Sequence, residues 1–195
     1  MTLAANRGLA HASDMDDLAL SVRLARPEDA ADLARIYIDS WQDTYAGMIS
    51  HALLGAMSHK HHTARWLAAI KGPTTVLVAE DTRTGLVGLS SLGSARDRSL
   101  GFEGEIYTLY VDPAFLGLGT GRALLEGAFD NLKARKLRSC LVWAHARNNA
   151  CFFYEAMGGK RVATRTTRLM GELTPEVAFG WRQLVTRKQK RTLPQ

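Results

Sequence analysis

Three glycines at every second position, Gly117, Gly119 and Gly121, form a segment suited to holding phosphate. Glycine has no side chain, so the backbone can come close to a ligand. The apolar segment 107–111 precedes this loop, and a helix of about residues 119–135 follows it. The start of a helix offers unpaired N–H groups and the positive end of its dipole, both of which attract anions. The spacing therefore predicts a phosphate-binding turn between a strand and a helix.

Two common nucleotide-binding loops do not fit this segment. A P-loop ends in Gly-Lys-Ser/Thr, whereas Arg122 and Ala123 follow Gly121 here. A dinucleotide-binding loop has the spacing G-x-G-x-x-G early in a βαβ array. Here the spacing is G-x-G-x-G, and the loop comes late, after strands that we expect to be antiparallel. Acyl-CoA is the phosphate ligand left to consider.

Two separate segments resemble the signature of the GCN5-related N-acetyltransferase (GNAT) superfamily. Residues 109–113 (LYVDP), 116–121 (LGLGTG) and 122–125 (RALL) are similar to its fourth strand, its pyrophosphate loop Q/R-x-x-G-x-G/A and the helix start. Residues 148–159 (NNACFFYEAMGG) are similar to its later N-x-x-A-x-x-F-Y-E motif. Two departures stand out. Leu116 replaces the usual Gln or Arg, which removes one polar contact that Arg122 could supply, and a full-length match of the second motif would start at Arg147 instead of Asn148.

The resemblance implies an enzyme that moves the acetyl group of acetyl-CoA to a primary amine by direct attack. Tyr154 matches the tyrosine that protonates the leaving thiolate. An irregularity in the strand at 109–111 would expose an N–H for the thioester oxygen and let pantetheine pair with this strand. The residues implied to contact acetyl-CoA are Leu109, Tyr110, Val111, Leu116, Gly117, Leu118, Gly119, Thr120, Gly121, Arg122, Asn148 and Tyr154.

Glu105 is the first choice for the base that takes the amine proton. Its offset from Leu116 resembles that of the glutamate base in the histone acetyltransferases of the superfamily. Strand alternation predicts that Glu105, Tyr107, Leu109 and Val111 share one face, where burial would suit a carboxylate to base chemistry. A solvent-exposed or arginine-paired glutamate stays open at this stage, and Glu103 is the second choice for the base.

The sequence defines the acceptor amine less closely than it defines the cofactor. Trp41 and Tyr45, in the pattern W-x-x-x-Y-x-G, predict either packing at a helix end or one wall of the acceptor pocket. The acceptor is a small molecule or a peptide amine. Two alternatives remain: a non-catalytic acyl-CoA-binding or sensor protein, and an acetyltransferase acting on a tRNA- or ribosome-associated amine. Nucleic acid binding has no recognition motif in its favour.

Hydrophobic periodicity predicts the elements that position these residues. Strands are expected near 20–24, 74–80, 86–92, 103–111, 139–143, 160–169 and 177–185, and helices near 27–47, 57–71, 119–135 and from 148 or 149 to 157. This order predicts one α/β (α+β) domain over residues 19–185. Its sheet would be mixed, with helices over its faces. The resemblance implies that this sheet is GNAT-like: mostly antiparallel, of about seven strands flanked by four helices, and splayed at strands 4 and 5. Residues 1–18 read as a flexible leader and 186–195 as a basic tail.

Composition bears on the compartment of the protein, on membrane segments and on metal sites. The chain has 195 residues, of which 46% are hydrophobic, and a formal net charge of +6. It has two cysteines outside any CxxC pair, which fits a reducing compartment and predicts a cytoplasmic protein. No apolar segment reaches membrane-spanning length. His51, His59, His61 and His62 lack further ligands at a usual metal spacing, so we expect no metal. A homodimer stays open.

Overall fold

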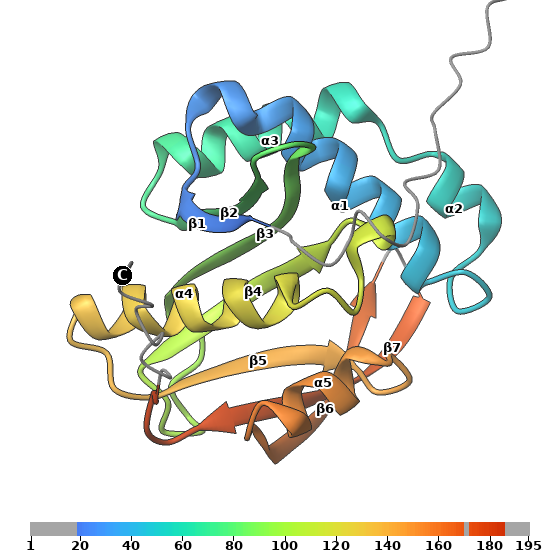
Figure 1. The fold of residues 1–195 in the computed structure, drawn as a ribbon. Helices are drawn as coiled ribbons and strands as arrows, with labels where there is room; N and C mark the ends of the chain where they lie inside the picture. The colour runs from blue at the N-terminus through green and yellow to red at the C-terminus, as the bar shows by residue number, and fades with distance from the viewer. Residues whose placement is uncertain (1–18, 170–171, 186–195) are drawn as a thin grey trace, which may run out of the picture.

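The computed structural model describes residues 19–169 and 172–185. Both the predicted leader, 1–18, and the predicted tail, 186–195, lie outside the described residues. Seven strands form one sheet in the order β1-β2-β3-β4-β5-β7-β6 (Figure 1). The strands are β1 (Leu20–Leu24), β2 (Thr75–Asp81), β3 (Gly85–Ser94), β4 (Gly104–Val111), β5 (Cys140–His145), β6 (Lys160–Leu169) and β7 (Glu172–Trp181).

Helices cover both faces of this sheet. Within the described ranges these are α1 (Ala30–Thr44), α2 (His51–Gly55), α3 (His59–Lys71), α4 (Thr120–Ala134) and α5 (Ala150–Ala156), with 3-10 turns at Pro27–Asp29 and Pro113–Phe115. The prediction of a mixed, mostly antiparallel sheet with flanking helices is confirmed. The short α2 adds to the four expected helices. The Ser50 side chain caps it by accepting the Leu53 N–H.

Apolar side chains on the two faces of the sheet explain why the helices lie where they do. Leu124, Leu125, Ala128 and Leu132 recur at helical spacing along α4 and are fully buried against the sheet. On the opposite face, α1 and α3 pack over β2 and β3 through a second core cluster. Figure 1 shows α4 crossing the sheet on one side and α1 to α3 gathered on the other. The sheet is thus a rigid layer whose open edges present backbone.

The central strands β4 and β5 diverge. They are the parallel pair of the sheet, and they pair only at Gly104–Cys140, Glu105–Leu141 and Ile106–Val142. Beyond this point β4 stays paired with β3 as far as Val111, while β5 stays paired with β7 as far as His145. The edge of β4 over residues 107–111 is therefore unpaired on the β5 side, as the predicted splay requires.

A β-bulge in β4 changes which side chains share a face. In the register with β3, Thr108 lies opposite Ser91 and Ile106 opposite Leu92, so Tyr107 is an extra residue. Ile106 and Leu109 consequently pack on the same core as α4. The prediction that Glu105 and Tyr107 share a face with Leu109 and Val111 is wrong, because the extra residue reverses the alternation. The irregularity lies at Tyr107 and not at 109–111.

The last strand begins and ends earlier than predicted. Strand β7 runs from Glu172 to Trp181 instead of 177–185, and its polar first half pairs with β6. Residues 172–176 (ELTPE) carry little hydrophobic signal, and Pro175 is unusual in a strand. The inward alternation starts only at Val177, with Phe179 and Trp181 following in the core.

Within the described part of the chain, no helix is long and apolar enough to cross a membrane.

Candidate active site

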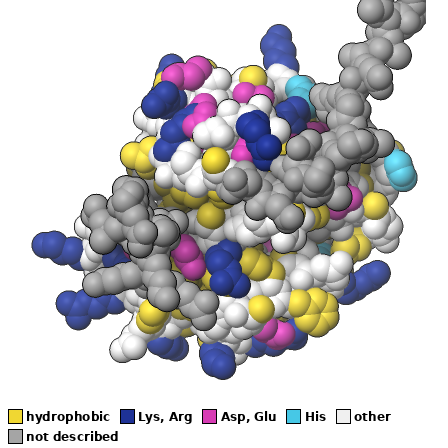
Figure 2. All heavy atoms as spheres, in the orientation of Figure 1, with side chains coloured by type: hydrophobic (Ala, Val, Ile, Leu, Met, Phe, Trp, Pro, Cys, Tyr) yellow, Lys and Arg dark blue, Asp and Glu magenta, His cyan; other side chains and the backbone are white. Residues whose placement is uncertain are grey.

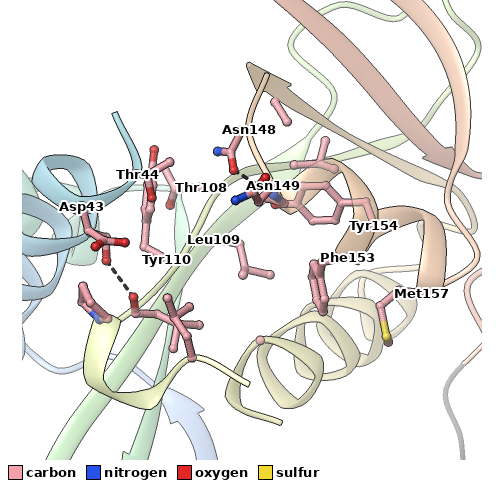
Figure 3. A pocket seen from close by; sticks show the side chains of 18 of the residues that line it. Asp43, Thr44, Thr108, Leu109, Tyr110, Asn148, Asn149, Phe153, Tyr154 and Met157 are labelled. Atoms are coloured by element: carbon pink, nitrogen blue, oxygen red, sulfur yellow. Dashed lines mark hydrogen bonds between the residues drawn. The ribbon is translucent and has the colours of Figure 1, made fainter. Parts of the chain in front are cut away.

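A cleft of about 620 Å³ opens where β4 and β5 diverge. It extends from the start of α4 and the inner face of α5 to the end of α1. Figure 3 shows Phe153 and Tyr154 from α5, with Met157 at its C-cap, on one side of Leu109, and Asp43, Thr44 and Tyr110 on the other. Phe153 and Met157 are four residues apart, which places both on one helix face.

The glycine loop lies at one end of this cleft and matches the predicted phosphate turn. Gly117 and Gly119 have φ angles of +79° and +86°, a left-handed conformation that favours glycine. Open space surrounds both at the positions where a Cβ would project. Gly119 is the N-cap of α4, so the first N–H groups of a 15-residue helix follow it. The loop therefore fits a pyrophosphate on its backbone and at the helix dipole.

Contacts with α1 position this loop. Asp112 accepts the Ala114 N–H and pairs with Arg35 at 2.7 Å. Ser40, which is buried, donates its hydroxyl hydrogen to the Val111 carbonyl at 2.8 Å. The sequence reading did not identify Arg35 or Ser40, because both are ordinary residues within a helix pattern. They tie the end of β4 and the start of the loop to α1.

The free edge of β4 presents backbone donors to the cleft. The Asp112 N–H bonds the Val87 carbonyl on β3 at 2.9 Å. Because N–H groups alternate sides along a strand, those of Leu109 and Val111 face the gap toward β5. They can pair with an extended ligand or donate to an oxygen that gains negative charge.

Tyr154 reaches the middle of the cleft from α5. It lines the cleft and is only 4% exposed, with its ring against Phe179 and Trp181. Burial, together with the nearby Tyr45 phenol, raises the pKa of Tyr154. The phenol is therefore protonated at neutral pH and can donate a hydrogen bond in the cleft.

Only one of the two aromatic residues predicted to form the acceptor wall lines the cleft. Tyr45 lines the cleft, whereas Trp41 packs behind it at a centroid distance of 4.7 Å and does not line the cleft. Asn148 lines the cleft, but its Oδ1 accepts the Ala150 N–H at 2.8 Å at the start of α5. Its side chain thus stabilises the helix start, whatever it contributes to a ligand.

Neither predicted base lines the cleft. Glu105 is 2% exposed and is held by Arg96, whose backbone N–H and guanidinium both donate to the carboxylate. It lies two residues before Tyr107, which does line the cleft. Glu103 lies outside β4, is exposed and accepts the Arg138 N–H. Of the two, Glu105 is nearer in sequence to the cleft-lining part of β4.

Most of the residues predicted to contact a cofactor come together. Ten of the twelve line the cleft: Leu109, Tyr110, Val111, Leu116, Gly117, Gly119, Gly121, Arg122, Asn148 and Tyr154. Leu118 and Thr120 do not. Thr120 is 1% exposed and faces inward, where its methyl group lies near Gly88. The sequence reading missed Asp43, Thr108, Trp143 and Arg147, which also line the cleft.

Charged side chains and possible metal ligands are distributed as follows over the described residues. On the face seen in Figure 2, Lys and Arg side chains are scattered among acidic ones instead of joining in one patch. In the part of the chain that the structure describes, no group of three or more His, Cys, Asp or Glu could hold a metal ion. Cys140 and Cys151 are free thiols, both buried.

Comparisons with known proteins agree with this geometry. The model of the acetyltransferase (GNAT) family matches residues 30–159. YuaI, an uncharacterized N-acetyltransferase of Bacillus subtilis (strain 168), is 32% identical over 166 residues, 85% of this chain and 94% of that protein. A GCN5-related N-acetyltransferase structure from Rhodopseudomonas palustris has a TM-score of 0.67 at 25% identity, covering 82% of this chain and 93% of its own. The structure of yncA from Salmonella typhimurium, with its cofactor acetyl-CoA, has a TM-score of 0.61 at 20% identity, covering 90% and 99%.

Proposed function

The chain belongs to the GNAT family of acetyltransferases, and we propose that it moves the acetyl group of acetyl-CoA to a primary amine by direct attack in a ternary complex. The observation that carries this proposal is the divergence of β4 and β5 beside the glycine loop. It joins a phosphate site, a free strand edge and a buried phenol in one cleft. Acetyl-CoA supplies an activated acetyl thioester there.

The residues at the loop would hold the pyrophosphate. We assign the backbone of 117–121 and the first turn of α4 to the phosphates. Leu116 is 56% exposed and offers no polar contact. Arg122 is exposed and lines the cleft, so it would supply the polar side-chain contact that Gln or Arg makes at position 116 in the family motif.

The residues in the middle of the cleft would act on the reacting groups. The N–H of Leu109 or Val111 would donate to the thioester oxygen as negative charge develops on it. The Tyr154 phenol would donate to the departing sulfur. A buried phenol is a weak acid, so its contribution would be a hydrogen bond that strengthens as the thiolate forms, followed by proton transfer.

We propose Glu105 as the group that accepts the amine proton, through water, because its carboxylate does not line the cleft directly. Replacing Glu105 with glutamine is expected to lower turnover at neutral pH by about 100-fold. Activity should recover in part at high pH, where solvent deprotonates the amine. Glutamine keeps the size of the side chain and an oxygen that can accept from Arg96.

The measurement is a pair of pH–rate profiles, for wild type and Glu105→Gln, with Glu103→Gln as the matched control. Glu103 is exposed and away from the cleft, so its loss should leave the profile unchanged. If Glu105→Gln follows the wild-type profile at every pH, Glu105 is not the base.

Initial-rate kinetics test direct attack. With an accepted amine, double-reciprocal lines at several acetyl-CoA concentrations should intersect, and incubation with acetyl-CoA alone should leave the protein unacetylated. Parallel lines and an acetylated protein would indicate a covalent intermediate. The two cysteines give no support to such an intermediate, because both are buried and the pKa of each thiol is raised by burial.

A non-catalytic acyl-CoA sensor is the competing proposal, and Leu116 is the observation in its favour. Acetyl-CoA binding without turnover on any amine would support it. An acceptor on a tRNA or ribosome stays a prediction of lower rank, because the sequence has no nucleic-acid recognition motif. A cytoplasmic location and a homodimer also stay predictions.

A further inference from the structure

Two guanidinium groups lie over aromatic side chains that line the cleft. Arg165 on β6 lies 3.9 Å from the centroid of Trp143, and Arg96 lies 4.9 Å from that of Tyr107. Trp143 and Tyr107 both line the cleft. On β5, Val142 and Ala144 pack in the core with α4, so Trp143 between them faces the opposite side.

A carboxylate fixes each guanidinium in place. Arg165 pairs with Glu176 through Nε at 2.6 Å, and Arg96 pairs with Glu105 through Nε and Nη2. A guanidinium has five N–H donors in a planar fork, so donors remain for a second anion on each. The Arg165 side chain is 39% exposed and that of Arg96 is 61% exposed. Stacking on a ring limits the plane in which those donors can point.

Tyr107 and Trp143 directly follow Ile106 and Val142, the last residues at which β4 and β5 pair, so the two arginine–aromatic pairs are neighbours where these strands diverge. The pKa of Arg96 is raised first by its hydrogen bonds to Glu105 and also by the charge of Glu176, the partner of Arg165. The pKa of Asp97 is lowered by hydrogen bonds from Ser99 and also by the charge of Arg165. Neither arginine lines the cleft itself, so the two cations would act on an acceptor from beside the Trp143 and Tyr107 rings.

We propose that the acceptor is an amine that also carries a carboxylate, as amino acids and short peptides do, and that Arg165 and Arg96 bind this carboxylate. The proposal rests on the acetyltransferase function proposed above and names the acceptor class for the same cleft. Arginine held flat on a ring binds carboxylates with defined geometry and little loss of side-chain freedom. A polycationic acceptor would instead be repelled by both guanidinium groups.

The test compares acceptors that differ only in the carboxylate. Free amino acids and dipeptides are each paired with their C-terminal amides, and kcat/KM is measured from thiol release. The wild type is expected to prefer the free acid by about tenfold or more, the contribution of a charge-assisted bidentate contact. Comparing kcat/KM for the amino acids with kcat/KM for the dipeptides shows which of these two kinds of carboxylate-bearing amine is the acceptor.

Arg165→Gln should reduce this preference to within about threefold while turnover of the amides persists. Arg165→Lys, which keeps the charge but loses the fork, should give an intermediate preference. Arg161→Gln is the matched control: Arg161 also lies on β6, pairs with Glu155 through Nε at 2.7 Å and lies 5.6 Å from the Phe179 ring. Its contacts are with α5 and the core on the other face, so the preference should stay.

A wild type that acetylates amides as well as free acids overturns this inference and leaves the proposed function standing. An unchanged preference in Arg165→Gln also overturns it. If the wild type binds acetyl-CoA but acetylates no amine of either kind, the proposed function itself has failed. Turnover of amides by Arg165→Gln, together with an unchanged thermal unfolding midpoint, shows that the variant is folded.

Discussion

Replacing Gly119 with glutamate is expected to lower the affinity for acetyl-CoA by about 100-fold or more, a loss of about 3 kcal/mol in binding free energy. Gly119 is the N-cap of α4 and borders the cleft, with open space where a side chain would project. A carboxylate there would occupy the proposed phosphate position and repel the phosphate charge. Calorimetric titration with acetyl-CoA measures the effect.

The matched control for this variant is Gly85→Glu. Gly85 has a φ angle of +82°, also with open space around a built Cβ, but it is the first residue of β3, at the turn from β2, and does not line the cleft. Both substitutions place a non-glycine residue at a left-handed φ angle, so both carry the same kind of backbone strain, about 1–2 kcal/mol. Only Gly119→Glu should lose acetyl-CoA. Equal affinity in the two variants would show that the loop does not bind the pyrophosphate.

Replacing Tyr154 with phenylalanine is expected to lower turnover by about 100-fold or more while acetyl-CoA affinity changes little. The ring keeps its packing against Phe179 and Trp181, and only the buried hydroxyl is removed. The hydroxyl is expected to interact with the departing sulfur, which carries charge only as the reaction proceeds. The effect should therefore appear in kcat and not in the acetyl-CoA dissociation constant.

Tyr37→Phe is the control for this second variant. Tyr37 is a partly buried phenol, and burial raises its pKa to about 12, but it lies among Trp41, His62 and Trp66 and does not line the cleft. Its loss should leave turnover within about threefold of wild type, since no proton-transfer role is removed. Wild-type turnover in Tyr154→Phe would remove Tyr154 as the acid.

Local patterns were enough to predict the order of the elements and one end of the site. The glycine spacing, the helix start and the later motif all depend on neighbours in sequence, and the family and the fold they indicated are confirmed. Gly119 begins α4 as its N-cap, and ten of the twelve predicted cofactor residues line one cleft. Thr120 does not line the cleft, because successive side chains at a helix start point in different directions and the Thr120 side chain points into the core.

Features that depend on pairing between distant segments could not be predicted. Tyr107 is a good strand residue, so nothing in its type marks the bulge that reverses the faces of β4. Trp41 and Tyr45 share helical spacing, but α1 ends at Thr44, and the ring of Tyr45 at the C-cap reaches the cleft. The stacking of Arg165 on Trp143 exists only because β6 and β5 flank β7.

The most direct test of the proposed function is thiol release from acetyl-CoA by the full chain with a panel of amines, followed by mass analysis of the products. The panel includes amino acids, peptides, polyamines and aminoglycosides. We expect CoA to be released in step with the gain of one acetyl group on an amine. Saturable acetyl-CoA binding with no acetylated product from any amine would contradict the enzyme and favour the sensor.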